Sequence, residues 1–389
     1  MRVDFPRKRL SNRRIMIVET PSFASLTLSE SERALLSALF RQGPMPRSDL
    51  SDLTPLSQQS VHRLLEKLAE QRLVRFGDPK IRGRGKPSPT VCLDPSRYAS
   101  LGVSISTERV GLCLLDLAGQ PLSEVVIDAK PGDPDSVLDR LDIQLDSWTS
   151  DLLSSRNLIG MGVGMQGWRT GRSDCFWPPE PLNLWRGLPL TEVFRDRFGM
   201  ACFAENNSTA SAIAEHYVSS GDAEKSLIYL SFDYGFGGGV FVDGHTLVGE
   251  HGNAGELSTL FAPEEAHSRP ALEELLKRLH DRGIIFDTVS EMVARFDPDW
   301  PGVDDWVHEV APQLRLMIRA LKAITDPGAI CFGGEAPSEL RQALLQACDG
   351  AMDGHGTPNP VLRESRIAGD AAHMGAAFLP LHATVFSGL

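Results

Sequence analysis

The sequence predicts an α/β protein in which a small winged helical module precedes a larger body. Two observations support this prediction. Leucines recur at helical spacing in the first ninety residues, and strand-like runs that end in glycine turns recur from Tyr98 onward. The 389 residues are enough for two or three domains. Hydrophobic content of 42% and charged content of 23% are typical of a globular protein.

Composition also indicates the compartment. No apolar run approaches the roughly 20 residues that span a membrane. The basic N-terminal stretch has no apolar segment behind it, as a signal peptide would. None of the six cysteines stands at CxxC spacing, which predicts free thiols and neither a zinc site nor a redox pair. We therefore expect a cytoplasmic protein with no membrane partner.

Charge is unevenly distributed along the chain. The whole chain carries −12, but residues 1–93 hold 17 Lys/Arg against 9 Asp/Glu. This stretch therefore carries +8 and the remainder −20. A basic head on an acidic body indicates that the head binds a polyanion. A solubilising basic tail is the alternative, but it does not explain the second basic cluster at residues 75–86.

Residues 29–73 have the pattern of three helices. The first is expected to begin at an N-cap on Ser29 or Ser31 and to end at Gly43. A short helix is expected over residues 46–54, and a third after an N-cap at Ser57. The predicted buried faces hold Leu35, Leu36, Leu39 and Phe40 in the first helix and Val61, Leu64, Leu65 and Leu68 in the third. Three helices with a short turn before the last follow the helix-turn-helix plan.

Residues 73–94 predict two strands around a basic, glycine-rich loop, which makes the module winged. The start of the third helix would face base edges in the major groove, and the wing would contact phosphates or the minor groove. The candidate base readers are Ser57, Gln58, Gln59, Ser60, His62 and Arg63. The candidate wing contacts are Lys80, Arg82, Arg84 and Lys86. A small protein-binding bundle is the alternative to DNA binding.

The body reads as strands that feed glycine turns and helix starts, a pattern that favours an α/β fold with a cleft at the strand ends. Two stretches are distinctive: ENNSTASAIAE at residues 205–215, and the glycine-rich YLSFDYGFGGGVFVDG, which precedes AGE at 254–256. Both are similar to motifs of the ROK family of repressors, open reading frames and kinases. The wing sequence GRGKP resembles the repressor branch of that family.

The resemblance implies a winged helix-turn-helix followed by a two-lobed body of the actin and hexokinase type. It implies a DNA-binding domain at 1–93 that includes the basic N-terminal extension. A first lobe would comprise 96–207 plus 376–389, and a second lobe 208–375.

Departures from the family pattern concern the kinase chemistry. Asn207 stands where the kinases have the aspartate that accepts the sugar proton, and losing a general base costs about 10²–10⁴ in rate. Ser104 and Glu108 occupy the expected phosphate loop. Asp233 and Tyr234 replace a Gly-Thr pair, and a further carboxylate would repel a triphosphate. The resemblance with these departures implies a degenerate sugar kinase that is no longer an enzyme.

The family's zinc site is also missing from the sequence. Residues 262–274 contain no cysteine where the family has a cysteine cluster. Thr259 stands at the position of the zinc-ligand histidine, and His267 nearby is expected to be a surface residue. We expect no bound metal and no cofactor.

Residues that the family uses to hold a sugar are retained. Amides and carboxylates of this kind bind vicinal hydroxyl groups through paired hydrogen bonds. The sugar-binding residues that the resemblance implies are Gly167, Asn183, Asn206, Glu256 and Glu273. We expect Asn207, although it replaces the kinase aspartate, to bind a sugar hydroxyl through its amide as well.

We therefore expect a sugar-responsive, DNA-binding transcriptional regulator. Its partners would be operator DNA and a sugar or sugar derivative, and repression relieved by the sugar is the expected mode. Binding to two half-sites predicts a homodimer or a higher homo-oligomer. Two alternatives stay open: an ATP-dependent sugar kinase that also binds DNA, and a body that binds a protein partner such as a phosphotransfer component.

Overall fold

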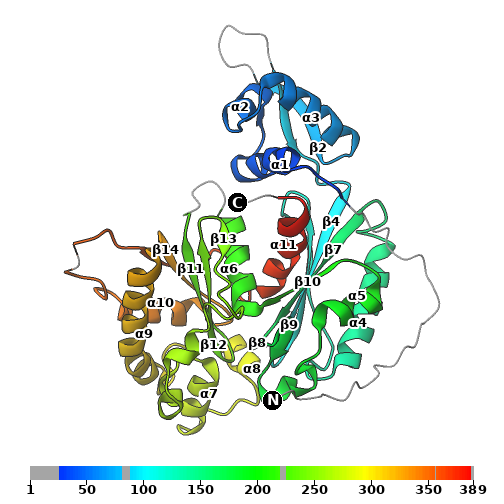
Figure 1. The fold of residues 1–389 in the computed structure, drawn as a ribbon. Coiled ribbons are helices and arrows are strands. Elements are labelled where there is room, and N and C mark those ends of the chain that lie inside the picture. Colours follow the sequence, from blue (N-terminus) through cyan, green and yellow to red (C-terminus); the bar gives the residue numbers. More distant parts are fainter. Residues whose placement is uncertain (1–25, 81–87, 220–224, 355, 387–389) are drawn as a thin grey trace.

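The computed structural model describes residues 26–80, 88–219, 225–354 and 356–386, and it shows a small head above a body of two lobes (Figure 1). Within these ranges no helix combines the length and the apolarity needed to cross a membrane. The wing residues Arg82, Arg84 and Lys86 lie outside the described residues, as do residues 1–25 of the basic N-terminal extension.

The head contains three helices and a three-stranded antiparallel sheet in the order β1-β3-β2. Its elements are α1 (Glu30–Gln42), β1 (Met45–Pro46), α2 (Arg47–Asp52), α3 (Gln58–Glu70), β2 (Val74–Lys80) and β3 (Ser88–Leu93). Local chemistry sets the helix ends. Ser29 caps α1 in a reciprocal pair with Glu32, Gly43 ends α1 with a positive φ of 74°, and Ser57 accepts from the Ser60 amide at the start of α3. These boundaries confirm the sequence-based prediction.

The first lobe is built on a five-stranded sheet in the order β10-β7-β4-β5-β6. Its strands are β4 (Tyr98–Ile105), β5 (Val110–Asp116), β6 (Pro121–Ile127), β7 (Asn157–Met165) and β10 (Cys202–Asn206). Helices α4 (Pro134–Thr149) and α5 (Leu190–Phe198) belong to this lobe. A short hairpin of β8 (Trp168–Thr170) and β9 (Arg172–Trp177) follows β7, and a 3-10 segment, η1 (Glu180–Trp185), comes next.

The second lobe repeats this plan with the order β13-β12-β11-β14-β15. Its strands are β11 (Leu227–Phe232), β12 (Phe236–Val242), β13 (His245–Thr246), β14 (Ala329–Gly333) and β15 (Val361–Glu364). Its helical segments are η2 (Leu257–Leu260), η3 (Pro263–Ser268), α7 (Leu272–His280), α8 (Val289–Ala294), α9 (Val303–Thr325) and α10 (Ser338–Ala347). In both sheets three antiparallel strands precede two parallel ones, so the lobes are topological repeats.

Equivalent helices follow the last strand of each lobe, α6 (Asn207–Val218) and α11 (Ala372–Thr384), and they pack together between the two sheets (Figure 1). Small residues allow this contact. A Cβ added at Gly375 would lie 1.7 Å from the Ala210 carbonyl oxygen, and one at Gly162 would lie 1.8 Å from the Ala376 carbonyl oxygen. The alanine- and serine-rich α6 therefore fits against a second backbone.

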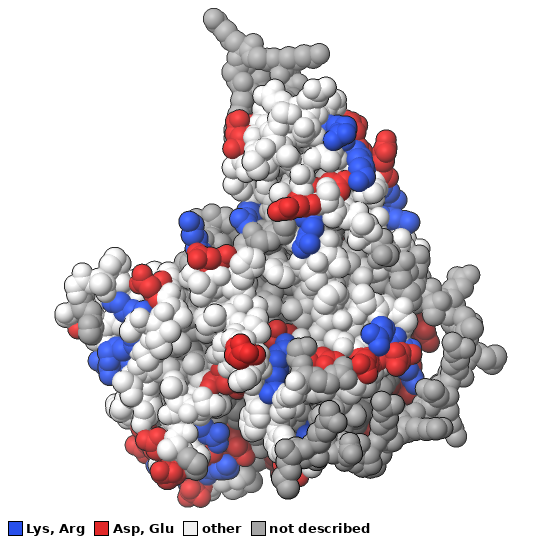
Figure 2. Space-filling view, viewed as in Figure 1, with Lys and Arg blue, Asp and Glu red and all other residues white. Residues whose placement is uncertain are grey.

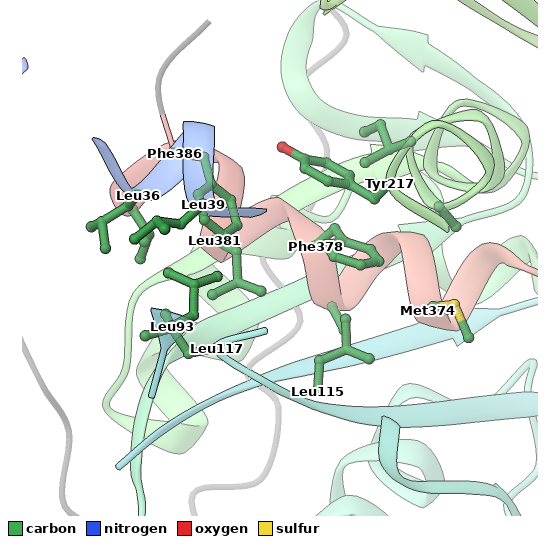
Figure 3. Close-up of a cluster of buried hydrophobic side chains, with 14 of the residues drawn as sticks. Leu36, Leu39, Leu93, Leu115, Leu117, Tyr217, Met374, Phe378, Leu381 and Phe386 are labelled. Carbon is green, nitrogen blue, oxygen red and sulfur yellow. The ribbon is translucent and has the colours of Figure 1, made fainter. Parts of the chain in front are cut away.

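The hydrophobic core of the head is continuous with that of the body. Leu36 and Leu39 of α1 belong to the same buried cluster as Phe378 and Leu381 of α11 and Phe386 beyond it (Figure 3). The Arg33 guanidinium also donates to the Phe386 carbonyl at 2.9 Å. The head therefore packs against the C-terminal end of α11 and shares a hydrophobic core with the body.

Candidate ligand pocket between the lobes

A cavity of about 330 Å³ opens between the lobes where α6 begins. Its lining comes from both lobes, and polar groups are gathered on it. The lining includes Ser106, Glu108, Gln166, Gly167, Trp168, Trp177, Pro178, Pro179, Glu180, Arg186, Asn206, Asn207 and Ser208 from one side. It includes Asp233, Tyr234, Gly235, Phe236, Gly237, Glu256, Ser258, Arg269, Glu335 and Asp370 from the other. Clefts of this size, with a few polar groups placed among apolar ones, are typical small-molecule sites.

Asn206 organises the cavity at the start of α6. Its side-chain oxygen accepts from the Ser208 amide at 2.8 Å and caps the helix. Its Nδ2 donates to the Gly167 carbonyl at 2.8 Å and to Glu256 Oε1 at 3.1 Å. Asn206 therefore contacts the start of α6, the turn at Gly167 and the Glu256 carboxylate. Because Gly167 belongs to the first lobe and Glu256 to the second, these bonds link the two lobes at the cavity.

The side chain of Asn207 is buried, and among the described residues only the nitrogen of its amide has a hydrogen-bond partner. Its Nδ2 donates to the Ile105 carbonyl at 3.1 Å, while its Oδ1 has no hydrogen-bond partner among the described residues. Gly164 leaves the space for this amide, because a Cβ there would lie 2.4 Å from Oδ1. A buried acceptor without a partner costs free energy, which a hydroxyl donor in the cavity would recover.

Glu256 lies at the cavity wall with a perturbed carboxyl group. Burial raises the pKa of Glu256 to about 6. Its Oε1 accepts from Asn206, so the group keeps a fixed orientation. A carboxylate held in this way can accept hydrogen bonds from ligand hydroxyls at neutral pH.

The other two residues expected to bind the sugar lie outside the lining. Asn183 sits on η1, where its amide donates to Glu180 at 3.1 Å. Glu273, at the start of α7, accepts from the Tyr234 hydroxyl at 2.9 Å and pairs with Lys277 at 3.2 Å. The cavity thus brings together Gly167, Asn206, Asn207 and Glu256, while Asn183 and Glu273 support residues near it.

In the part of the cleft where the kinases would bind the phosphates of ATP, charged side chains of this protein contact one another and the backbone. Glu108, in the turn between β4 and β5, crosses to the second lobe. Its carboxylate accepts from the Val289 amide at 2.8 Å and the Ser290 amide at 2.7 Å, at the start of α8. Two backbone donors at the start of α8 are therefore satisfied by the Glu108 carboxylate.

A second cross-lobe contact lies beside the first. Arg109 pairs with Glu335 at 2.6 Å and lies 3.9 Å from Asp370. Asp233 accepts from the Glu335 amide at 2.7 Å. Burial, reinforced by Asp370, raises the pKa of Asp233 to about 6, and burial raises the pKa of Glu335 as well. Three carboxyl groups share one guanidinium here, an arrangement that repels a polyphosphate.

The sequence predicted the amides and Glu256, which line the cavity. It did not single out Arg186, Trp168 and Trp177, which also line it, or the cross-lobe Arg109. The sequence could have indicated the tryptophans, because Trp168 directly follows Gly167 and Trp177 stands nine residues further along the chain. Nothing local in the sequence indicated a role for Arg109, because its partner Glu335 is more than two hundred residues away.

The expected metal position offers no ligand set. Thr259 donates its hydroxyl to the Glu256 carbonyl at 2.7 Å, and His267 is exposed, 3.9 Å from Glu309. Across the part of the chain that the structure describes, no cluster of three His, Cys, Asp or Glu side chains could hold a metal ion. The absence of bound metal stays a prediction.

The candidate base readers lie at the exposed start of α3. Gln58 and Gln59 are exposed, as are His62 and Arg63, whereas Ser57 and Ser60 are engaged in the helix cap. His62 Nδ1 lies 2.7 Å from Arg47 Nη1, so its ring is oriented by the neighbouring helix. Lys80 ends β2, and the rest of the wing lies outside the described residues.

Comparison with known proteins places residues 100–382 in the ROK family. The chain belongs to this family. Its resemblance to ROK proteins is thereby confirmed over the whole body, from β4 to α11.

Relatives of this ROK protein include regulators. It is 27% identical to the uncharacterized protein y4fQ of Sinorhizobium fredii over 93% of both chains. It is 23% identical to the xylose repressor of Bacillus subtilis and 24% identical to the transcriptional dual regulator NagC of Escherichia coli, each over 58% of this chain. These matches cover 59% and 55% of the two regulators' lengths.

Solved structures agree on the fold. A ROK transcriptional regulator, a homologue of the E. coli Mlc protein, matches 90% of this chain with a TM-score of 0.71 at 20% identity. A ROK glucokinase of Streptomyces griseus, in complex with glucose and AMPPNP, matches 72% with a TM-score of 0.59 at 19% identity. The regulator match extends over more of the chain than the kinase match.

Proposed function

We propose that this ROK protein is a sugar-responsive transcriptional repressor without kinase activity, whose DNA affinity falls when a sugar or sugar derivative enters the cavity. One observation carries the proposal. The N-terminal end of α6 lines the cavity through Asn206 and Asn207, and Tyr217 near its C-terminal end touches the head. Regulators named for xylose and for N-acetylglucosamine among the relatives support a saccharide as the ligand.

The contact with the head is aromatic. The Phe40 ring, at the end of α1, packs edge-on against Tyr217 of α6 at 5.2 Å and against Phe378 of α11 at 6.1 Å. Tyr217 and Phe378 are themselves stacked at 4.4 Å. Phe40 therefore sits where the two interlobe helices meet.

The two helices are fixed to different lobes, so a change in lobe angle would act on this junction. Glu215 of α6 is fully buried. It pairs with Arg363 in β15 and accepts from Ser365, just after β15, at 2.7 Å, and both partners belong to the second lobe. Helix α11 packs on the first-lobe sheet at Gly162. A ligand that binds one lobe angle better shifts the population toward it and displaces Tyr217 relative to α11.

Operator binding by a symmetric dimer completes the proposal. Two heads would read two half-sites whose spacing matches the dimer. A change in how Phe40 packs on Tyr217 and Phe378 then alters the spacing of the two heads. The ligand cavity and the DNA-binding surface are thereby coupled, because each spacing of the heads has a different affinity for the operator.

The test is a thermal-shift screen of sugars and sugar phosphates with the full-length protein, followed by a DNA-release assay for each compound that stabilises it. We expect at least one saccharide to raise the melting temperature and to weaken operator binding. Asn206→Ala should abolish the response while DNA binding persists. A protein that no saccharide stabilises, or whose DNA affinity is unaffected by a bound saccharide, would contradict the proposal.

A sugar kinase that also binds DNA is the second candidate, favoured by the likeness of the body to the glucokinase fold. We expect no ATP turnover with any sugar, because Glu108 holds the amides of α8 and the carboxyl groups around Arg109 oppose a triphosphate. Asn207→Asp should also stay inactive. Turnover by the native protein would establish the kinase, and turnover by Asn207→Asp alone would show that the phosphate side is usable.

A further inference from the structure

Two exposed tryptophans stand at the mouth of the cavity. Of the six in the chain, Trp168 is 47% and Trp177 39% exposed, whereas Trp148, Trp185 and Trp306 are buried. Both exposed rings line the cavity that contains the Asn206 and Asn207 amides. Large aromatic side chains left in solvent beside a polar cavity indicate a binding function.

The β8–β9 hairpin sorts its side chains by face. Trp168 and Trp177 are direct cross-strand partners, and their rings are parallel within 7° with centroids 6.4 Å apart. The next pair, Arg169 and Phe176, points inward and is buried. The hairpin thus presents both indoles together on its outer face, while other residues hold it to the protein.

The inner face fixes the hairpin firmly. Arg169 pairs with Glu205 at 2.6 Å. The Arg169 backbone exchanges two hydrogen bonds with the Asn253 side chain of the second lobe, at 2.7 and 3.0 Å. The neighbouring Gly167 has φ of 111°, and a Cβ there would lie 2.4 Å from the Trp177 carbonyl oxygen. The tryptophans are therefore held in place without contributing to the core.

Polar groups surround this aromatic surface. The Arg186 guanidinium carbon lies 4.0 Å from the Trp177 ring centroid, a cation–π contact that holds the indole from one side. Arg186 also lies 3.6 Å from Glu180, and its buried Nε has no hydrogen-bond partner among the described residues. Both side chains line the cavity, so hydrogen-bonding groups are available beside the indoles, with Arg186 over one face of Trp177.

We propose that Trp168 and Trp177 form a second subsite, which binds an additional pyranose ring of a disaccharide or glycoside whose first ring contacts Asn206, Asn207 and Glu256. This inference deepens the proposed function and rests on it. A pyranose presents an apolar face of C–H groups with hydroxyls around its edge. Indole rings match the face, while Arg186 and Glu180 match the edge.

The surroundings favour a sugar ring over a protein partner at this surface. The tryptophans are continuous with a polar cavity, and the flanking Arg186 and Glu180 carry opposite charges. Hot spots of protein interfaces instead lie in well-packed, fully desolvated pockets, whereas these indoles lie beside an open polar cavity. A second copy of the chain is the other possible occupant, and the test separates it.

The test compares matched saccharides on the full-length protein by calorimetry: glucose with cellobiose and maltose, xylose with xylobiose, and N-acetylglucosamine with its β-1,4-linked dimer. We expect one disaccharide to bind roughly tenfold more tightly than its monosaccharide, equivalent to about 1.4 kcal/mol. Its binding should also change the tryptophan fluorescence. Trp168→Ala and Trp177→Ala should reduce the advantage to less than about threefold. Leu184→Ala, an exposed η1 residue outside the lining, is the matched control and should keep the full advantage.

The outcomes separate the two proposals. If monosaccharides bind but no disaccharide binds more tightly, or if the tryptophan variants keep the advantage, the second subsite is wrong and the proposed function stands. If no saccharide of either length binds, both fail. If the tryptophan variants change the oligomeric state in light scattering, the pair belongs to an interface between copies and the subsite is wrong.

Discussion

At the scale of single residues, burial of the Glu256 carboxylate at the cavity wall lowers the stability of the folded protein at neutral pH. Burial raises the pKa of Glu256 from 4.5 to about 6, so the folded state binds this proton more tightly than the unfolded state. Stability from this group is therefore greatest below about pH 4.5 and falls as pH rises to about 6, after which the full cost persists. A shift of this size corresponds to at most about 2 kcal/mol.

Glu256→Gln should accordingly raise the free energy of unfolding at pH 7.5, by up to about 2 kcal/mol, and by less at pH 5. The glutamine carbonyl can still accept from Asn206, so the hydrogen bond is kept. Urea unfolding at the two pH values measures the effect. Glu264→Gln, an exposed carboxylate outside the cavity lining, is the control. An equal change at both pH values would mean that the carboxyl group is not desolvated as described.

At the scale of elements, the decisive feature is the pair α6 and α11, with Phe40 of the head between their ends. Phe40→Ala removes ring contacts to Tyr217 and Phe378 in the shared core. Loss of a partly buried phenylalanine costs up to about 3–5 kcal/mol. We expect the melting temperature of the whole protein to fall, and hydrogen exchange to increase at the C-terminal ends of α6 and α11 as well as in α1.

The matched control is Leu53→Ala, an exposed leucine of the head. It should leave exchange in the body unchanged. If Phe40→Ala increased exchange in the head alone, the head would fold independently and the proposed coupling through α6 would lose its support.

Local signals allowed most elements to be predicted. The caps at Ser29 and Ser57 depend on residues three positions away, and the glycine stop at Gly43 is equally local. The meeting of Asn206 with Glu256 came from a family resemblance. The contact of Glu108 with Val289 could not be predicted, because it joins segments 181 residues apart and depends on how the lobes meet. For the same reason the sequence could not place Asn183 and Glu273 relative to the cavity.

At the scale of the whole molecule, Glu108 and Arg109 hold the lobes together across the cavity. Glu108→Ala leaves the Val289 and Ser290 amides without their carboxylate acceptor. We expect the lobes to open and the radius of gyration from small-angle X-ray scattering to increase. Asp128→Ala, a fully exposed carboxylate of the first lobe, should leave it unchanged. An unchanged radius in Glu108→Ala would contradict this role of Glu108 and show that the other contacts between the lobes are sufficient for closure.

Charge at this scale also predicts which segments of the head would contact DNA. The described part of the head holds 8 Lys/Arg against 7 Asp/Glu, and Figure 2 shows both signs together on its surface. Most of the +8 of residues 1–93 therefore belongs to residues 1–25 and 81–87, which carry +4 and +3. Nonspecific phosphate binding should depend on these two segments, and base preference on α3.

Replacing both Arg82 and Arg84 with alanine should weaken binding to operator and random DNA alike. It should also reduce the slope of log K against log salt by about 2, since each phosphate contact contributes about 0.9. Gln59→Ala should instead weaken operator binding with little change in the salt slope, because a glutamine side chain carries no charge and reads a base edge. Fluorescence anisotropy over a salt series distinguishes the two effects. Equal losses on operator and random DNA for Gln59→Ala would show that Gln59 does not read a base. A salt slope unaffected by the arginine changes would show that Arg82 and Arg84 do not contact phosphates.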